Sequence, residues 1–432
     1  MEKKVEWYLE FVDPSYKPHN DELIALFYFE PAKGVSTNEA IGRIASESST
    51  GTWTTLFKMP PRMNKLKAHA FHHEGNIVKV AYPLDLWEKG NAPQLLSGIG
   101  GNIFGMKALD NLRLLDIHFP KSYLKSFPGP RHGINGIRKM MNVYKRPMLG
   151  AVPKPKIGFS DKEHAEIGFE TWMGGFDFVK DDENLTSTKF NNFDKRVRLL
   201  AKFRDKAEKL TGDVKDAYIN ITAETDEMKK RAKLLHNHGF KHAMIDVVVA
   251  GNSAVQTLRN TLGDYGMAIH AHRAMHAMFD KNPKHGMSMY MLAKLMRMMG
   301  VDQIHSGTAV GKLVGTAEEV KNIADTMREN KVSEKHNVRF AQDWHGLKQG
   351  FPVASGGVHP GLLPDLMKIL GDECVMLVSG GIHGHPKGTR AGAMAARQAI
   401  DAVHEGETLQ EHAKYNRELR EALEKWGGMR PV

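Results

Sequence analysis

The chain has 432 residues, of which 41% are hydrophobic and 25% are charged, and its formal net charge is +10. This composition is that of an ordinary globular protein with enough length for a sizeable core. The absence of an apolar run of about 18 residues, and of an apolar segment near the N-terminus, predicts a cytoplasmic protein with no membrane span.

The single cysteine indicates the redox compartment of the protein, and the charge pattern indicates the kind of partner to expect. Cys374 lies in an apolar, strand-like run, so we interpret it as a small core residue in a reducing compartment. Lysine and arginine are interspersed with acidic residues along predicted helices such as 197–210, as on any solvated helix face. No basic block interleaved with aromatic residues is present. We therefore expect a phosphorylated small substrate and no nucleic-acid partner.

Residues 1–130 predict a small α+β domain with a ferredoxin-like arrangement. Runs typical of antiparallel strands alternate with two helix-like runs, and 127–147 is the predicted linker to the next domain. The strand-like runs are 23–31, 52–59, 67–75, 76–84 and 113–120, and the helix-like runs are 38–49 and 91–101.

Residues 131–432 predict a (β/α)8 TIM barrel, because eight short apolar runs are each followed by an amphipathic helical run. An open doubly wound sheet is the rival fold. Its usual glycine-rich loop after the first strand is absent, and Pro153, Lys154, Pro155 and Lys156 stand there instead. The strand-like runs are 148–156, 176–183, 216–223, 241–250, 266–273, 301–307, 351–357 and 373–381, and 408–428 predicts an amphipathic terminal helix.

The second barrel strand ends in a lysine and acidic residues. Alternate strand residues share a face, so Lys180 and Asp182 point together at the barrel mouth, and Glu183 can join where the strand turns. Oxygen donors without cysteine favour a hard cation such as magnesium over zinc. The alternative is a solvated acidic loop. A lysine beside two metal-binding carboxylates needs a salt bridge or a loss of charge, and carbamylation by carbon dioxide would make it a third anionic ligand.

Histidines end the fifth predicted strand, where His270 and His272 alternate and Arg273 follows. A zinc pair of the amidohydrolase type is the competing interpretation. That family usually carries its H-x-H pair on the first barrel strand, and an adjacent arginine suits a phosphate or carboxylate better than a metal.

Small residues and cations at the remaining strand ends predict a phosphate site. The seventh and eighth strands end in Ser-Gly-Gly, which leaves bare backbone amides where barrels commonly bind phosphate. The sixth strand ends at His305, before a glycine-containing loop that carries Lys312. From the residues alone, the chain is a barrel enzyme that holds a divalent cation on carboxylates and binds a sugar phosphate.

These motifs together resemble the large subunit of ribulose-1,5-bisphosphate carboxylase/oxygenase (Rubisco), most of all its archaeal-type (form III-like) group. The likeness covers almost the whole chain in the order usual for the family. The matching motifs are E-S-S-T-G-T-W-T at 47–54, G-N-I-F-G at 101–105, K-P-K-x-G at 154–158, G-x-D-x-x-K-D-D-E-N at 175–184, H-x-H-R-A-M-H at 270–276, H-S-G-T-x-x-G-K-L at 305–313 and A-S-G-G at 354–357.

The resemblance implies carboxylation and oxygenation of ribulose 1,5-bisphosphate, with CO2 and O2 as co-substrates and 3-phosphoglycerate as product. Lys180 would be the carbamylated magnesium ligand and base, completed by Asp182 and Glu183. Lys154 would donate the late proton and Lys156 would orient it. The resemblance also assigns His272 to proton transfer and Lys312 to closure over the site.

The resemblance also assigns the substrate contacts and the assembly. Arg273 and His305 would hold one phosphate, and Ser355 a substrate hydroxyl. Residues from both domains would hold the other phosphate: Thr52, Trp53, Gly356, Gly357, Gly380 and Gly381. Because Glu47, Thr52, Trp53 and Asn102 complete a neighbouring subunit's site in this family, we expect a homodimer or a homo-oligomer of dimers, without a small subunit.

Three positions depart from the family pattern. The usual glutamate after the sixth-strand K-L is Val314, the usual G-G-G on the eighth strand is Ser379-Gly380-Gly381, and the common glutamine two positions earlier is Leu377. These departures concern loop closure and one phosphate pocket. The alternative functions are a Rubisco-like enolase or isomerase that does not carboxylate, and a catalytically dead assembly subunit. Carbon fixation and nucleoside salvage both stay open as pathways.

Overall fold

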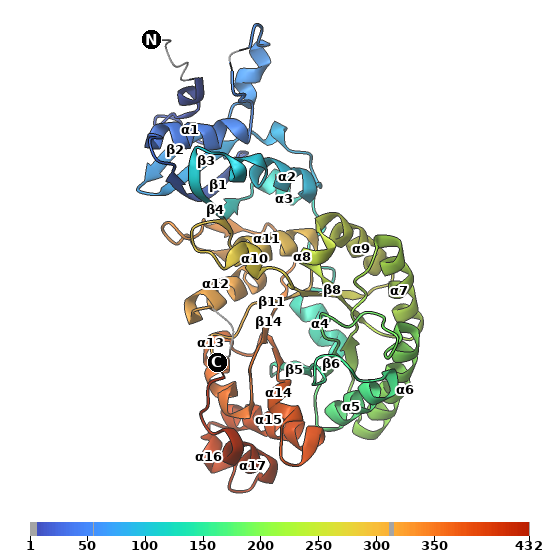
Figure 1. Ribbon diagram of the computed structural model, residues 1–432. Helices are drawn as coiled ribbons and strands as arrows, with labels where there is room; N and C mark the ends of the chain where they lie inside the picture. Colours follow the sequence, from blue (N-terminus) through green and yellow to red (C-terminus); the bar gives the residue numbers. More distant parts are fainter. Residues whose placement is uncertain (1–6, 55, 311–314, 432) are drawn as a thin grey trace. The chain divides into compact units, whose positions relative to one another are not determined.

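The computed structural model describes residues 7–54, 56–310 and 315–431 (Figure 1). The chain forms two compact units. The first contains the residues up to Pro128 with Met275–Met299 and Glu329–Leu347, and the second contains Gly129–Ala274, Gly300–Arg328 and Lys348 onward. The first unit thus includes two segments that lie beyond the predicted boundary at residue 130.

The first unit is built on a five-stranded sheet of order β10-β4-β1-β3-β2. The later segments belong to it because β10 pairs in parallel with β4 and helix α11 (Met289–Met299) is anchored to β4 by the buried Lys294–Asp116 ion pair. Its strands are β1 (Leu23–Pro31), β2 (His69–Glu74), β3 (Ile77–Tyr82), β4 (Leu109–His118) and β10 (Gly286–Met287), and its main N-terminal helices are α1 (Thr37–Glu47) and α2 (Ala92–Ile99).

The strand predicted at 52–59 is wrong for every residue of that run that the structure describes. Its large side chains are exposed, with Trp53 86% and Phe57 107% accessible. A β-branched and aromatic run becomes a strand only when a neighbouring strand pairs with it, because the propensity reflects packing on a sheet. A short 3-10 helix, Pro61–Leu66, follows instead.

The second unit is the predicted barrel. Its eight strands are all parallel and lie in the order β7-β6-β5-β15-β14-β11-β9-β8. A parallel bridge between Asn220 and Met244 joins the two outermost strands and closes the ring. The strands are β5 (Met148–Ala151), β6 (Phe178–Lys180), β7 (Asp216–Tyr218), β8 (His242–Asp246), β9 (Ala268–His272), β11 (Gln303–His305), β14 (Phe351–Ser355) and β15 (Val375–Leu377).

Helices follow the barrel strands along the chain, and α5, α6, α7 and α9 lie on their outer side (Figure 1). Ser160 begins α5 with a capping box closed by Glu163, which satisfies free amides of the first turn. The longer helices of this unit that follow barrel strands are α5 (Asp161–Met173), α6 (Phe193–Thr211), α7 (Thr225–Asn237), α9 (Asn252–Asp264), α12 (Ala317–Arg328), α13 (Leu363–Leu370) and α15 (Gly388–Glu405).

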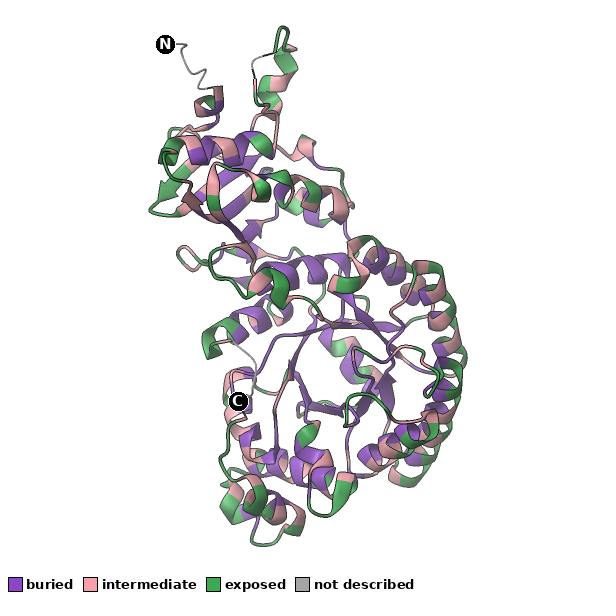
Figure 2. Cartoon of the chain, viewed as in Figure 1, coloured by how far each residue is buried: buried purple, intermediate pink, exposed green. Residues whose placement is uncertain are grey.

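The barrel strands are buried nearly throughout, as Figure 2 shows in purple. The reason is that one face packs in the barrel interior and the other against the helices. Interior residues such as Phe178, Tyr218 and Met244 form one cluster with Ile134 and Met141 of helix α4 (Gly133–Met141). The segment predicted as a linker therefore contains a helix whose apolar face adds to the barrel core.

The C-terminal segment forms two helices, α16 (Leu409–His412) and α17 (Arg417–Trp426), in place of the single predicted helix. Leu419 and Ala422 of α17 are buried, and Leu419 belongs to the same apolar cluster as residues of α15. Among the described residues, no helix is long and apolar enough to span a bilayer.

Candidate active site

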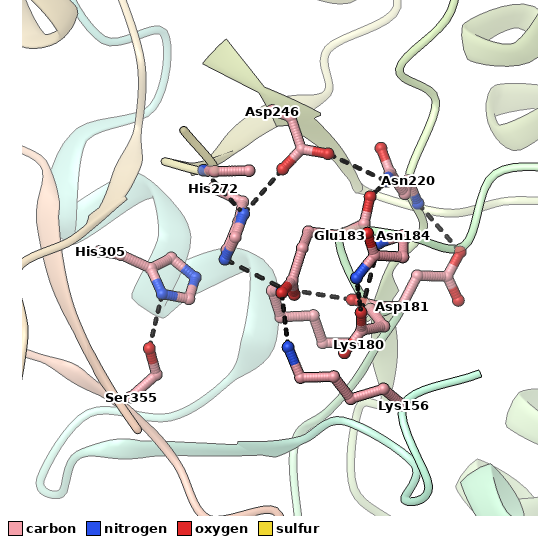
Figure 3. A network of polar contacts seen from close by, with 12 residues as sticks. Lys156, Lys180, Asp181, Glu183, Asn184, Asn220, Asp246, His272, His305 and Ser355 are labelled. Atoms are coloured by element: carbon pink, nitrogen blue, oxygen red, sulfur yellow. Dashed lines mark hydrogen bonds and ion pairs between the residues drawn. The ribbon is translucent and has the colours of Figure 1, made fainter. Parts of the chain in front are cut away.

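Several predicted site residues of the second unit, among them Lys180, Glu183 and His272, lie close together at the carboxyl ends of the barrel strands (Figure 3). Lys180 is the last residue of β6, His272 of β9, His305 of β11 and Ser355 of β14. This is the edge at which barrels of this fold carry their catalytic groups.

Two lysines that follow β5 are paired with the acidic residues that follow β6. The Nζ atom of Lys154 lies 3.3 Å from Oδ2 of Asp182, and that of Lys156 lies 2.8 Å from Oε1 of Glu183. Asn184 donates from its backbone and side-chain amides to the other Asp182 oxygen, at 3.2 and 3.0 Å. The structure thus brings the predicted cations and carboxylates into one cluster.

The ionisation of this cluster follows from burial and pairing. Burial lowers the pKa of Lys154, although the Asp182 carboxylate acts in the opposite direction. Burial opposes ionisation of Glu183, but the hydrogen bond from Lys156 and the His272 ring more than offset it and bring the pKa of Glu183 to about 2. The hydrogen bond to Glu183 raises the pKa of Lys156. Glu183 is therefore a carboxylate at neutral pH.

Lys180 is 1% exposed, and its Nζ atom donates to the backbone carbonyl of Asp181 at 2.9 Å. Burial lowers the pKa of Lys180, against the opposite effect of the Asp246, Glu183 and Asp182 carboxylates. A buried amine with a lowered pKa loses its proton more readily than a lysine in water, and the neutral amine is the nucleophilic form.

Asp181 lies between Lys180 and Asp182 in sequence and is bound by other partners. Its Oδ2 atom accepts from Arg196 Nε at 3.2 Å and from the Asn220 backbone amide at 3.0 Å, and His164 Nε2 lies 3.1 Å from Oδ1. Burial opposes its ionisation, but Arg196 and His164 more than offset this and lower the pKa of Asp181. Asp181 therefore anchors the strand end that carries the predicted metal ligands.

His272 has a partner that the sequence analysis missed. Its Nδ1 atom lies 2.7 Å from Oδ1 of Asp246, the last residue of β8, and its Nε2 atom lies 3.8 Å from Oε2 of Glu183. Asn220 donates from Nδ2 to the other Asp246 oxygen at 3.2 Å. Little in the sequence pointed to this partner, because the apolar run 241–250 continues past Asp246, and only the structure ends β8 at that residue.

His305 uses both ring nitrogens within the protein. Nδ1 lies 2.7 Å from Ser355 Oγ, and Nε2 lies 3.1 Å from His270 Nε2. The predicted contact from His305 to a phosphate therefore requires one of these two bonds to break. Arg273, the other predicted ligand of that phosphate, is 8% exposed and lies directly after β9.

The glycines that follow the last two barrel strands differ in backbone conformation and in the space around them. Gly356 and Gly357 adopt φ angles of 115° and 70°, a region that favours glycine. A Cβ atom on Gly381 would lie 2.4 Å from the Cα atom of His359, whereas one on Gly380 would meet nothing within 4 Å. A side chain would therefore have space at Gly380 but not at Gly381.

Two departures from the family pattern have structural roles here. Ser379 Oγ accepts a hydrogen bond from the Val152 backbone amide at 3.0 Å, which ties the end of β15 to the end of β5. Leu377 is buried in the interior cluster of the barrel. Val314 and the predicted loop residue Lys312 lie outside the described residues.

In the first unit, Glu47 and Asn102 line one cavity of about 270 Å³, together with Ser49, Trp87 and Gln94. Trp53 is exposed, and Thr52 is partly buried. The structure thus brings Glu47 and Asn102 together.

The second unit is a parallel (β/α)8 barrel that carries a buried lysine and two lysine–carboxylate pairs at the carboxyl edge of its strands, as a barrel enzyme does. Residues 133–426 match the Ribulose bisphosphate carboxylase large chain, catalytic domain, and residues 10–123 match its N-terminal domain. The chain therefore belongs to the Rubisco large-chain family, as the sequence motifs predicted.

Similar proteins cover the chain almost completely. A ribulose bisphosphate carboxylase of Pyrococcus furiosus is 54% identical over 99% of this chain and 100% of its own length. The octameric Rubisco of Pyrococcus horikoshii OT3, crystallised with sulfate, is similar with a TM-score of 0.90, 53% identity and 98% coverage of both chains. The dimeric archaeal Rubisco of Hyperthermus butylicus is similar with a TM-score of 0.93 and 48% identity, over 98% of this chain and 99% of the other.

Proposed function

We propose that this chain carboxylates ribulose 1,5-bisphosphate to 3-phosphoglycerate, with oxygenation as the competing reaction. The observation that carries the proposal is the pairing of Lys154 with Asp182 and of Lys156 with Glu183 at the catalytic edge of the barrel, where both carboxylates act on the buried Lys180 amine. The similar proteins that carry the carboxylase name span the full length of the chain and support it.

The donor set fits a magnesium ion. Asp182 and Glu183 offer only oxygen atoms, each paired with a lysine ammonium that a cation would replace, and a carbamate on Lys180 would add a third oxygen ligand. Bound there, magnesium would polarise the substrate carbonyl and stabilise negative charge on its oxygen. The carbamate forms when neutral Nζ of Lys180 attacks the carbon of CO2 and loses a proton, and burial of the amine supports this step.

The protein groups then divide the proton transfers. A carbamate on Lys180 would supply the base for the proton on the carbon next to the ketone, and His272 moves a proton at the neighbouring hydroxyl. Lys154 donates the final proton to the product carbon, and Lys156, paired with Glu183, orients it. Arg273 and the Gly356, Gly357 and Gly380 region bind the phosphates, and Lys312 stabilises the new carboxylate.

Assembly as a homodimer or as dimers of higher order, without a small subunit, is part of the proposal. The similar solved structures include one described as octameric and one described as dimeric. In such an assembly Glu47, Thr52, Trp53 and Asn102 would act in the site of a neighbouring subunit.

One assay tests the activity. The protein is incubated with labelled CO2, magnesium and ribulose 1,5-bisphosphate, and we expect labelled 3-phosphoglycerate from the wild type and none from Lys180→Ala. Product without label, or no product from this sugar, would instead favour a Rubisco-like enolase or isomerase.

A further inference from the structure

Both backbone polar groups of Val152 are bound by side chains from the end of the eighth barrel strand. The Val152 amide donates to Ser379 Oγ at 3.0 Å, and the Val152 carbonyl lies 3.0 Å from His383 Nε2. Ser379 precedes the short helix α14 (Gly380–His383), and His383 ends it. Val152 follows directly after β5, where the strand ladder stops, so these side chains replace the bonds that a neighbouring strand would make.

The partners of His383 determine its tautomer. A carbonyl oxygen only accepts hydrogen bonds, so Nε2 of His383 carries the hydrogen that it donates to Val152. Burial lowers the pKa of His383 to about 4, so the ring is neutral at pH 7 and its Nδ1 atom accepts. The Thr389 hydroxyl lies 3.0 Å from Nδ1 and donates to it. The ring is therefore held on both sides and donates to Val152 in a single protonation state.

Lys154 lies two residues beyond this anchored backbone. Pro153 stands between them, and its ring fixes one of the two soft backbone torsions of the connecting residue. Little conformational freedom is therefore left between the Val152 carbonyl and the Cα atom of Lys154. The positive charge of Lys154 also acts on the His383 ring, so the two side chains share one environment.

The ion pair between Lys154 and Asp182 is not enough to position the lysine in the proposed reaction. The pair joins Nζ and Oδ2 at 3.3 Å, and the Lys154 side chain is 30% exposed. In the proposed function a divalent cation takes the place of the ammonium group on that carboxylate. The bonds to Val152 do not involve Asp182, so they hold the backbone beside Lys154 with or without the ion pair.

We propose that Ser379 and His383 are positioning residues for Lys154, which they hold through the backbone of Val152 within reach of the carbon that it protonates. This inference rests on the proposed function, because that function gives Lys154 the final proton transfer. Ser379 accepts one of the two bonds where the family pattern has a glycine, which has no side chain to accept it. The same residue precedes Gly380, in the turn proposed to bind a phosphate.

The chemistry of the last step provides a measure of this positioning. Cleavage leaves a carbanion on the carbon that holds the new carboxylate, and the Lys154 ammonium gives it a proton to form 3-phosphoglycerate. When the proton comes late, the carbanion electron pair forms a double bond to the neighbouring carbon, and the carbon–oxygen bond to phosphate breaks. Phosphate leaves with that bonding pair, and the remaining enol tautomerises to pyruvate. Both products keep the carbon of the labelled CO2.

The experiment measures the ratio of labelled pyruvate to labelled 3-phosphoglycerate in the labelled-CO2 assay of the full-length protein. Ser379→Ala removes the acceptor at a backbone φ of −99°, which any residue adopts, and His383→Leu removes the donor. We expect each variant to raise the ratio about 3-fold or more and to lower kcat about 10-fold, with less change in KM, because a misplaced group slows its own step. Ser379→Thr and His383→Gln keep an acceptor and a donor, so they should bring the ratio back toward the wild-type value.

A merely structural role would lower the melting temperature without changing how the carbanion divides between the two products. A wild-type ratio in both Ser379→Ala and His383→Leu overturns the proposal, and if only one of them folds, a wild-type ratio in that one does so. A wild-type protein that makes no labelled product overturns the proposed function and this inference with it. Labelled 3-phosphoglycerate from the wild type, with unchanged ratios in the variants, overturns this inference alone.

Discussion

The Nδ1 atom of His272 lies 2.7 Å from Oδ1 of Asp246, so this carboxylate receives the ring N–H and leaves Nε2, 3.8 Å from Glu183, as the basic nitrogen. Asn220 donates to the second Asp246 oxygen and holds the carboxylate in place. Asp246 and Asn220 therefore hold the imidazole of His272 in one orientation.

Replacing Asp246 by asparagine is expected to lower kcat about 100-fold, because the amide can donate to Nδ1 and force the proton onto Nε2. The measurement is kcat and KM for carboxylation, with a thermal melt to show that the variant is folded. Asp264→Asn, at an exposed position at the end of α9, is the matched control and should behave as wild type. Wild-type kcat in Asp246→Asn would show that the pair does not set the tautomer.

Arg196→Lys is expected to weaken magnesium binding about 10-fold, because groups that orient metal ligands have effects of this size. Arg196 contacts Asp181, Asn191 and the Thr186 carbonyl through separate guanidinium nitrogens. The single ammonium group of a lysine cannot reach all three partners. The measurement is carboxylation rate against magnesium concentration.

Arg198→Lys, on the exposed face of the same helix, is the control for that experiment. If Arg196→Lys lowers the melting temperature but leaves the magnesium dependence at the wild-type value, the Asp181 network is structural only.

Lys294→Met is expected to cost about 3–5 kcal/mol of unfolding free energy, because it leaves the Asp116 carboxylate buried without its cation. Both side chains are 0% exposed and 2.9 Å apart, and Asp116 also accepts from the Phe340 backbone amide. Chemical denaturation measures the loss. The double variant Lys294→Met with Asp116→Asn should recover part of it, and a double variant no more stable than the single one would argue against this explanation.

His383 is expected to make the fold less stable as the pH falls. Its Nε2 and Nδ1 atoms each lie 3.0 Å from an oxygen, of Val152 and Thr389. Burial lowers the pKa of His383 from 6.5 to about 4, so between these values the unfolded chain binds a proton that the folded chain does not. The contribution of His383 to the free energy of unfolding is fully present above pH 6.5. Below that pH it decreases, by up to about 1.4 kcal/mol per pH unit.

Urea unfolding of wild type and His383→Asn at pH 7, 6 and 5 measures this effect. The variant should lose less stability than the wild type over that range, whatever its stability at pH 7. Parallel pH profiles for the two proteins would assign the acid sensitivity to other groups.

Much of the fold could be predicted from periodicity, because each barrel strand is an apolar run and each helix an amphipathic one. The polar residues at strand ends, Lys180, Asp182, Glu183, His272 and Ser355, were also predictable, since parallel strands present their carboxyl ends at one edge. The run at 52–59 misled the prediction, because strand propensity does not reveal whether a pairing partner exists.

The barrel, its catalytic edge and the family follow from the amino-acid sequence, because they depend on local pattern and motif order. The side-chain contacts across the barrel become visible in the three-dimensional structure alone: Asp246 with His272, Asp181 with Arg196, and Gln303 with His270. Each pair joins different elements of the barrel. Their contacts follow from strand register and helix packing, which arise when the whole barrel closes and which no single segment encodes.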